Sequence, residues 1–493
     1  MTMTTFVGGL PATLVWIAFP FFIGFSIYLL PRLDRMLALG VACVSLGYGL
    51  FRVFNPVPLN VQLLDHFGVT LIADSLSGYF VLVNALVTTA VIVYCWQKGK
   101  TAFFYTQAII LHGSVNAVFI CADFISLYVA LEVIGISAFL LIAYPRTDRS
   151  IWVALRYLFV SNTAMLFYLI GAVLVYQTHH SFAFSGLQGA PTDAIALIFL
   201  GLLTKGGVFV SGLWLPFTHS ESETPVSALL SGVVVKTGVF PLVRCALMVD
   251  EIGPIISIFG MGTAVLGVSY AILEKDTKRM LASSTISQLG FVLANPAAAG
   301  LYALTHGLAK AALFLTAGNL HSRSFRELRR NPIPRSAWVV LAIAGLSVSG
   351  FPLLAGFGAK VLTLKPLGSG TAIVMNIAAV GTAIAFSKFI FLPVQGELPD
   401  TSKMADQRSD RFGFWLAVGL LLFGLFAANG FSYETYMIAN LIKSLVIVGV
   451  GWLAYFVIFQ KLTFKLPQVV ERFEHLIGAM SLMLILLFGM VLA

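Results

Sequence analysis

The feature that most constrains this chain is a series of long apolar segments that recur from one end to the other. Segments of roughly 17–25 residues have the length that an α-helix needs to cross the hydrocarbon core of a bilayer. Helices also satisfy their own backbone hydrogen bonds there, so we expect an all-α polytopic membrane protein with about 14–16 transmembrane helices. The expected spans are 7–30, 36–54, 70–95, 104–121, 123–143, 153–176, 194–213, 226–248, 253–272, 281–297, 300–320, 336–364, 370–393, 411–429, 438–459 and 473–492.

The composition excludes an ordinary soluble domain, and the motifs exclude several kinds of site. Hydrophobic residues make up 59% of the 493 residues and charged residues only 10%, whereas soluble domains have about 25% charged residues. The four cysteines stand singly, without disulfide or metal spacing. The sequence has no Rossmann fingerprint, Walker loop, CxxC pair or haem motif. We therefore expect neither a cofactor nor a metal in this chain, and the net charge of +9, which lies mostly in short loops, does not indicate nucleic acid.

The basic residues predict the orientation of the chain in the membrane. They gather in the loops after the odd-numbered spans, as Arg32 and Arg35 do after the first and Lys98 and Lys100 after the third. Arg52 is an exception, and the loop after the seventh span has no Lys or Arg. The positive-inside rule then places both termini on the outer side. Since Arg32 is the first basic residue and follows the first apolar run, we expect a retained helix there instead of a cleaved signal peptide.

The stretch 201–232 carries a lysine inside an interrupted apolar segment. Lys205 stands among glycines, Pro216 follows, and a polar run precedes the next apolar segment. A lysine at membrane depth is costly and marks a functional site by default. The alternative is a lysine that snorkels from a helix end, but its position in the middle of the run argues against it.

A second stretch, 349–360, repeats this arrangement. Pro352 has glycines around it, and Lys360 follows. Two Gly/Pro-interrupted segments in corresponding places are the sequence pattern of a transporter with inverted repeats and discontinuous helices.

Further ionisable residues lie deep in other apolar segments. Glu132 lies roughly 13 Å into the fifth span at ~1.5 Å per residue, Lys236 lies inside the eighth, and His306 and Lys310 share one helix face in the eleventh. For Glu132 the structural alternative is a carboxylate paired with a lysine, and for His306 a hydrogen-bonded core histidine. Buried lysines and histidines exchange protons near neutral pH, so together these groups indicate a proton path.

Other charged residues favour structural interpretations. Lys388 lies near a helix end and is expected to snorkel, and Arg244 is expected to anchor its helix at the membrane interface. Asp74 is expected to start a helix. His219, Glu221 and Glu223 line an entrance or form a solvated connector, and the sequence leaves both alternatives open.

At these residues the chain resembles the antiporter-like membrane subunits shared by Mrp-type cation/proton antiporters and respiratory complex I. The resemblance covers roughly 70–390. The matching stretches are LEVIGISAFLLIA, LLTKGGVFVSGLWLPFTHSESETPVSALLSG, VVKTGVFPLVR, KDTKRMLASSTISQLG, THGLAKAALFLTAG and GLSVSGFPLLAGFGAK.

The resemblance implies two inverted five-helix repeats with discontinuous seventh and twelfth helices. It divides the chain into N-terminal helices (1–100), a first repeat (101–250), a second repeat (251–395) and C-terminal helices (396–493). It also implies that Glu132 pairs with Lys205, that Lys236 is the central relay, that His306 and Lys310 continue it, and that Lys360 is the terminal lysine.

The resemblance implies a function and leaves alternatives open. The chain looks most like the D-type Mrp subunit, although it has two additional spans beyond about residue 430. We therefore expect a proton-translocating subunit of a multi-subunit Na⁺/H⁺ antiporter in an energy-coupling membrane, the inner membrane of a bacterium, and not an enzyme as a single chain. The alternatives are a proton-pumping subunit of an NAD(P)H–quinone oxidoreductase and an energy-coupling subunit for another partner. All three imply further membrane subunits as partners.

Overall fold

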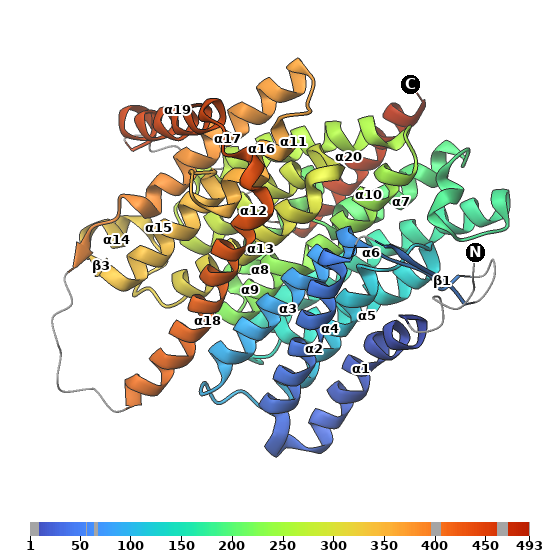
Figure 1. The fold of residues 1–493 in the computed structure, drawn as a ribbon, viewed down its shortest axis with the longest axis horizontal. Helices are drawn as coiled ribbons and strands as arrows, with labels where there is room; N and C mark the ends of the chain where they lie inside the picture. The colour runs from blue at the N-terminus through green and yellow to red at the C-terminus, as the bar shows by residue number, and fades with distance from the viewer. Residues whose placement is uncertain (1–8, 56, 64–67, 396–405, 461–471, 493) are drawn as a thin grey trace. The chain divides into compact units, whose positions relative to one another are not determined.

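The computed structural model describes residues 9–55, 57–63, 68–395, 406–460 and 472–492 (Figure 1). It has helices at every predicted span, so the all-α prediction is confirmed. In the described residues, 13 helices are long and apolar enough to cross a membrane, and the chain is therefore an integral membrane protein. The predicted spans 104–121, 281–297 and 336–364 correspond to shorter, more polar or divided helices. The polar composition of residues 394–410 predicts a linker there, and most of this stretch lies outside the described residues.

The chain divides into two compact units. Unit 1 comprises Met1–Gly206, Val233–Ile255 and Ile477–Ala493, and unit 2 comprises Gly207–Gly232 and Ile256–Leu476. The chain passes from unit 1 to unit 2 directly after Gly206, the residue that follows Lys205, and returns just before Lys236. Each unit is described separately below.

Unit 1 is a helical bundle with a small hairpin. Its complete helices are α1 (Gly9–Leu29), α2 (Asp34–Phe54), α3 (Ser75–Cys95), α4 (Ala102–Val118), α5 (Phe124–Ile142), α6 (Asp148–His179), α7 (Thr192–Lys205) and α10 (Lys236–Met248). Helix α2 packs on α3, and α6 packs on both α5 and α7, while α10 packs on α7. The third span starts later than predicted, because Thr70–Ala73 is strand β2, which pairs antiparallel with β1 (Leu59–Gln62).

Carboxylate side chains start two of these helices. Asp74 accepts a hydrogen bond from the backbone N–H of Ser77 at the start of α3, and Asp123 accepts one from Ser126 at the start of α5. An acidic N-cap satisfies a backbone donor that the helix leaves unpaired and complements the positive end of its dipole. The predicted helix-start role of Asp74 is confirmed.

Unit 2 is organised around α13 (Ala299–Ala317), all of whose residues are buried. Helix α13 contacts α12 (Thr277–Ala294), α15 (Arg335–Ser349), α18 (Asp406–Ala428), α9 (Thr224–Leu229) and α16 (Ala355–Leu364). The other elements of the unit are η4 (Phe209–Trp214), α8 (Leu215–Glu221), most of α11 (Ile252–Leu273), α14 (Phe325–Arg330), β3 (Ile333–Pro334), α17 (Ser369–Ile390), β4 (Val394–Gln395), η7 (Asn429–Thr435) and α19 (Ile438–Ala454). Helix α20 (Phe473–Leu492) begins in unit 2 and continues into unit 1.

The helices are broken at both predicted places. The seventh span stops at Lys205 and resumes as η4 and α8, and the residues between include Gly207 with φ +66°. The twelfth divides into α15 and α16 around Gly350, whose φ is +84°. Glycine adopts this left-handed conformation without steric cost, which explains why the chain breaks there. The eighth span also contains an irregular turn, a π-helix over Leu230–Val234 just before α10. Whether the two halves are inverted repeats stays a prediction.

Candidate functional site

The predicted proton-path residues all lie in helices, and most are buried. The exposed fraction is 3% for Lys205, 0% for Lys236, 3% for His306, 0% for Lys310 and 6% for Lys360. Glu132 is half-buried on α5. Unit 1 holds Glu132, Lys205 and Lys236, and unit 2 holds His306, Lys310 and Lys360.

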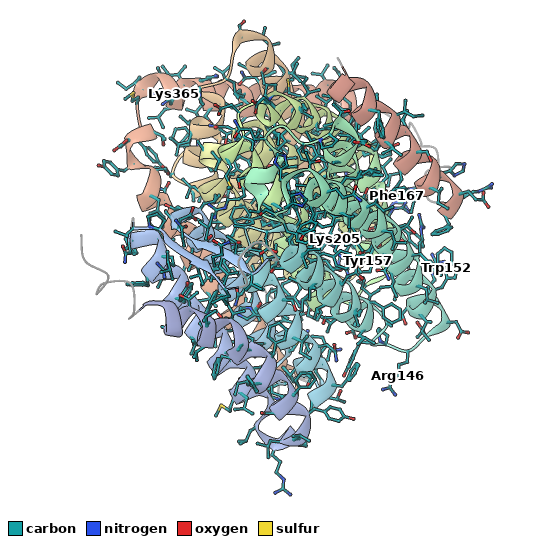
Figure 2. The ribbon with its side chains drawn as sticks, turned by 90° about the vertical axis from the view of Figure 1, so that its right-hand side faces the viewer. Arg146, Trp152, Tyr157, Phe167, Lys205 and Lys365 are labelled. Carbon is teal, nitrogen blue, oxygen red and sulfur yellow. The ribbon has the colours of Figure 1, made fainter. Side chains whose placement is uncertain are left out.

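Lys205 is the last residue of α7 and lies close to Tyr157 of α6 (Figure 2). Nζ donates a 2.6 Å hydrogen bond to Ser161 Oγ on α6 and lies 5.9 Å from the centre of the Tyr157 ring. Gly135 on α5 leaves room for it, because a Cβ at that position would lie 3.2 Å from Nζ. The C-terminal end of a helix also favours a positive charge.

Glu132 acts on Lys205 by electrostatic attraction instead of direct contact. The two charges interact, but within the part of the chain that the structure describes no ion pair of 4.0 Å or less joins them. Glu132 precedes Gly135 by one turn of α5, so the carboxylate lies on the same helix as the gap that holds the ammonium. The direct partner of the Lys205 ammonium group is therefore Ser161, and the implied pairing with Glu132 stays a prediction.

Lys236 begins α10, next to the end of α7. Gly238 allows the two backbones to touch, since a Cβ there would lie 2.2 Å from the Gly206 nitrogen. Because Gly206 follows Lys205 directly, the helices that carry the two lysines meet at the residues beside them. This close packing fixes the position of Lys236 relative to Lys205 within unit 1.

Arg244, predicted to anchor α10 at the interface, is instead a buried partner of Asp74. Its exposed fraction is 5%, and its guanidinium donates to both oxygens of the Asp74 carboxylate and to Ser77 Oγ. Burial raises the pKa of Asp74, but the hydrogen bonds and the charge of Arg244 outweigh this and leave the pKa below its ordinary value of 3.8. The ion pair joins the start of α3 to the helix of Lys236.

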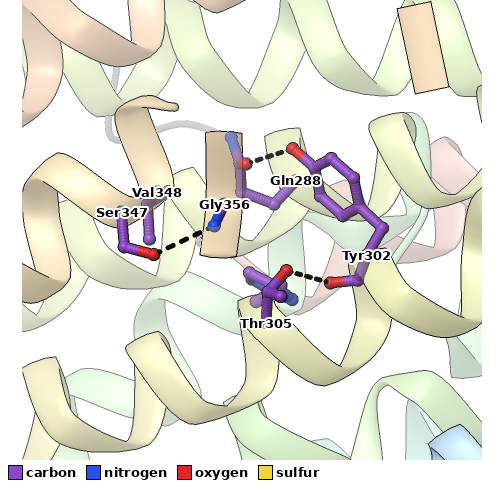
Figure 3. A pocket seen from close by; sticks show the side chains of 7 residues that line it. Gln288, Tyr302, Thr305, Ser347, Val348 and Gly356 are labelled. Atoms are coloured by element: carbon purple, nitrogen blue, oxygen red, sulfur yellow. Dashed lines mark hydrogen bonds between the residues drawn. The ribbon is translucent and has the colours of Figure 1, made fainter. Parts of the chain in front are cut away.

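In unit 2, His306 and Lys310 occupy one face of α13. Lys310 Nζ donates to the Leu281 carbonyl at 2.9 Å and to Ser284 Oγ, both on α12. His306 lines a small cavity, with room for about one water molecule, together with residues of α12, α13, α15 and α16 (Figure 3). The other lining residues are Gln288, Tyr302, Thr305, Ser347, Val348 and Gly356.

The polar lining of this cavity is held in place by its own hydrogen bonds. Tyr302 donates to Gln288 Oε1 at 2.6 Å, and the Gly356 N–H donates to Ser347 Oγ at 3.3 Å (Figure 3). The cavity therefore reaches from His306 to the broken helix that carries Lys360. Sequence reasoning missed these residues, because neutral polar side chains are common in apolar segments and carry no signal of their own.

Lys360 and Lys205 share one structural feature. Lys360 Nζ donates at 3.3 Å to the carbonyl of Ser349, the last residue of α15, while Lys205 itself ends α7. The Lys360 ammonium group and the residue Lys205 thus each lie at the C-terminal end of the first half of a broken helix. The negative end of the helix dipole stabilises a proton on both lysines.

Lys388 does not snorkel as predicted. It is 7% exposed, and Nζ donates to the carbonyls of Ala271 at 3.0 Å and Glu274 at 2.7 Å, at and just beyond the end of α11. The prediction was wrong because a lysine close to a helix end along the chain is here covered by a neighbouring helix. The hydrogen bonds of the Lys388 ammonium group cap the carbonyl groups at the C-terminal end of α11.

The three residues left open as an entrance or a solvated connector differ in burial. His219 is fully buried, so a solvated connector is excluded for it, while Glu221 and Glu223 are half-buried. Sequence reasoning missed the neighbouring Lys278, whose Nζ donates to the Ser222 carbonyl at 2.9 Å. In the sequence, Lys278 stands among the basic loop residues that determine the orientation of the chain in the membrane, so it gave no signal of a buried position.

Among the described residues, no three His, Cys, Asp or Glu side chains gather closely enough to hold a metal ion.

The sequence matches a family model described as "NADH:quinone oxidoreductase/Mrp antiporter, TM" over residues 121–386. Among curated relatives, the N subunit of the NADH-quinone oxidoreductase of Desulforudis audaxviator is 28% identical over 382 residues, which cover 69% of this chain and 75% of the relative. The D-type subunit of the Na(+)/H(+) antiporter of Alkalihalophilus pseudofirmus is 27% identical over 376 residues, 69% of this chain and 76% of that protein.

Two solved structures share the fold. A chain of the membrane-bound sulfane sulfur reductase, an archaeal respiratory membrane complex, matches with a TM-score of 0.75 and 18% identity over 90% of this chain and 99% of that chain. A chain of the Mrp complex from Dietzia sp. matches with a TM-score of 0.73 and 22% identity. That match covers 95% of this chain but only 59% of the Mrp chain.

Proposed function

Because the chain belongs to the NADH:quinone oxidoreductase/Mrp antiporter transmembrane family, we propose that it is the proton-translocating subunit of a multi-subunit Na⁺/H⁺ antiporter. The observation that carries the proposal is the burial of four lysines on four separate helices, α7, α10, α13 and α16. A charged side chain at membrane depth costs free energy, so such residues are found mainly where they serve to move ions or protons.

The proton path uses the buried groups of each unit. In unit 1, Glu132 tunes the charge of Lys205, Ser161 holds its ammonium group, and Lys236 takes the proton further. In unit 2, Lys310, His306 and Lys360 continue the path, and the polar cavity beside His306 holds the water that proton transfer between side chains requires. A desolvated lysine is suited to this role because burial brings its neutral and charged forms close in free energy.

The same proposal includes the division into repeats, the orientation of the termini and the location of the sodium path. The first repeat comprises residues 101–250 and the second 251–395, between N-terminal helices (1–100) and C-terminal helices (396–493). Both termini lie on the outer side of a bacterial inner membrane, as the loop charges favour. The chain itself is a transporter subunit without catalytic activity, and the sodium path lies in a partner chain.

A second candidate is a proton-pumping subunit of an NAD(P)H–quinone oxidoreductase. Curated relatives with that name favour it, among them the N subunit of Desulforudis audaxviator and a chain 4 of Synechocystis sp., 27% identical over 417 residues. An energy-coupling subunit for another respiratory partner is a third candidate, supported by the fold shared with the sulfane sulfur reductase. In both, the redox centres belong to other chains.

Purification of the native complex separates the candidates. An antiporter complex is expected to lack flavin and iron–sulfur absorbance and to dissipate a pre-formed proton gradient in everted vesicles when Na⁺ or K⁺ is added. Redox chromophores that co-purify with the chain, together with no response to either cation, would contradict the antiporter proposal and support the redox-coupled one.

A further inference from the structure

The break between α15 and α16, residues 350–354, contains two residues in the left-handed conformation. Gly350 has φ +84°, and the N–H of Phe351 bonds to the Leu346 carbonyl at 2.9 Å, which is the bond of a Schellman motif. Leu353 has φ +72°, a conformation that is sterically unfavourable for a residue with a Cβ. Such a conformation persists only where the surrounding structure holds it. The break therefore depends on contacts from other elements of unit 2.

The side chain of Lys360 lies directly against this break. Gly350 leaves room for the lysine stem, because a Cβ at Gly350 would lie 2.8 Å from Lys360 Cδ. The ammonium group donates to the Ser349 carbonyl at 3.3 Å and lies 5.1 Å from the centre of the Phe291 ring. The backbone at Ser349 and Gly350 therefore sets the position of the ammonium group, and a shift of the break would move its acceptor.

A residue of the C-terminal part of unit 2 holds the same backbone. Ser444 of α19 donates a hydrogen bond from Oγ to the carbonyl of Gly350. Two neighbouring carbonyls thus have different donors, since Ser349 accepts from Lys360 and Gly350 accepts from Ser444. The last carbonyls of a helix have no partner within it, so side chains from elsewhere satisfy them. Ser444 thereby joins α19, one of the two additional spans, to the residue beside the acceptor of Lys360.

The segment that leads into α19 contacts the remainder of the break. Asn429 Nδ2 donates to the Leu353 carbonyl at 3.4 Å, and the ring of Tyr436 packs on that of Phe357 in α16 with centroids 5.0 Å apart. The Tyr436 hydroxyl donates to Asn429 Oδ1 at 2.8 Å, so these two contacts support each other. Helix α16 also packs on η7. The chain from 429 to 444 therefore contacts the break from its first residue to the helix that follows it.

We propose that Ser444 is a positioning residue for Lys360 and that the segment 429–444 is a clamp that holds the break. The inference rests on the proposed proton-translocating function and gives a role to one of the two additional C-terminal spans. Ser444 acts through the Gly350 backbone, which fixes the Ser349 carbonyl to which the ammonium group bonds. A lysine that exchanges protons must stay within hydrogen-bond reach of its partners, so a fixed break keeps Lys360 in place for transfer.

The deciding variant is Ser444→Ala, which removes only the hydroxyl. The whole complex, with its natural partners, is reconstituted in vesicles, and a pH-sensitive dye reports proton movement. We expect normal assembly and a roughly three- to tenfold lower maximal rate, the factor that one hydrogen bond is worth. The Na⁺ concentration at half-maximal rate is expected to stay unchanged, because the sodium path is assigned to a partner chain. Ser444→Thr keeps the hydroxyl and is expected to restore the rate.

Hydrogen–deuterium exchange of the purified complex tests the clamp without any transport. Peptides that cover residues 350–358 are expected to exchange faster in Ser444→Ala than in the unmutated complex, because a segment with fewer contacts opens locally more often. The matched control for both measurements is Ser269→Ala, the same change at an exposed serine of unit 2 that bonds only to a carbonyl of its own helix. Neither the rate nor the exchange is expected to change in this control.

The results separate the positioning role from the function on which it rests. If Lys360→Ala abolishes proton movement but Ser444→Ala retains the full rate, the positioning role is wrong and the proposed function stands. Faster exchange without a lower rate, or a failure of Ser444→Thr to restore the rate, would also contradict the positioning role. If the unmutated complex moves no protons with Na⁺, K⁺ or NAD(P)H oxidation, the proposed function is wrong, while the exchange experiment still shows whether Ser444 holds the break.

Discussion

The ammonium group of Lys205 bonds to Ser161 Oγ at 2.6 Å, while the Glu132 carboxylate acts on it without direct contact. This arrangement separates two tasks that a direct ion pair would combine. The hydroxyl fixes the position of the ammonium group, and the carboxylate adjusts its charge. A lysine held in this way can change its protonation state without breaking a buried ion pair, which would be strongly unfavourable.

Ser161→Ala is therefore expected to lower proton movement without preventing assembly. The substitution removes the direct acceptor of a buried ammonium group, and such a hydrogen bond contributes about 1.5–3 kcal/mol, so we expect a decrease of roughly tenfold or more. The measurement is the initial rate of dye response in everted vesicles. Ser269→Ala is the control, since that exposed serine bonds only to a carbonyl of its own helix. Equal rates for Ser161→Ala and the unmutated complex would show that the hydroxyl is not needed.

Gly135→Ala tests the space that holds the same ammonium group. The added methyl would lie 3.2 Å from Lys205 Nζ, closer than ordinary van der Waals contact, so the ammonium group must shift from its position by a few tenths of an ångström. We expect a several-fold lower rate with little loss of assembled complex. Gly47→Ala on α2 is the matched control, because a Cβ there meets no atom within 4 Å. Unaltered transport in Gly135→Ala would contradict the position assigned to Lys205.

Lys388→Gln is expected to reduce stability but to leave the transport rate per assembled complex unchanged. Its ammonium group caps carbonyls at the end of α11, and leaving such buried groups unpaired costs roughly 1–3 kcal/mol. Thermal unfolding of the purified complex measures the loss, with the exposed Lys365→Gln as control. A normal Tm with a strongly reduced rate would instead place Lys388 on the proton path.

The Asp74–Arg244 pair predicts a pH-dependent contribution to stability. The pKa of Asp74 is lower in the folded protein than its ordinary 3.8. The carboxylate therefore stabilises the fold above that pH, and the contribution is lost as the pH falls through the folded pKa. We expect Asp74→Asn to have a lower Tm than the unmutated protein at pH 7, with the difference shrinking below 3.8. A difference that stays constant down to pH 3 would exclude the ionised carboxylate as its cause.

Much of the fold was predictable, because it is determined by the lengths of the apolar segments, which can be read directly from the sequence. Apolar length located the long helices, and the broken helices at Lys205 and Lys360 followed from glycines and prolines within apolar runs. The limits of the spans were less accurate where local structure intervenes. Residues 70–73 are apolar enough to extend the third helix, but they pair with Leu59–Gln62 as a strand instead.

The candidate site was predictable only in its charged members. A lysine in an apolar segment stands out, so Lys205, Lys236, Lys310 and Lys360 were found, whereas residues such as Ser161 are ordinary in a membrane helix. The partners of charged residues depend on contacts between distant parts of the chain. Arg244 has the sequence position of an interfacial anchor, but its acceptor, Asp74, lies 170 positions away in the sequence.

The central claim is that Lys205 carries protons and that Glu132 tunes its charge, and the most direct test measures variants of both residues in the native assembly. Lys205→Ala and Glu132→Ala are each expressed with all natural partner subunits in everted vesicles. Respiration sets the proton gradient, a pH-sensitive dye reports its loss when Na⁺ or K⁺ is added, and Lys365→Ala serves as the exposed-lysine control. The account predicts normal assembly of both variants with loss of cation-dependent proton movement, while the control behaves as the unmutated complex does. Full proton movement in both variants would contradict the assigned path.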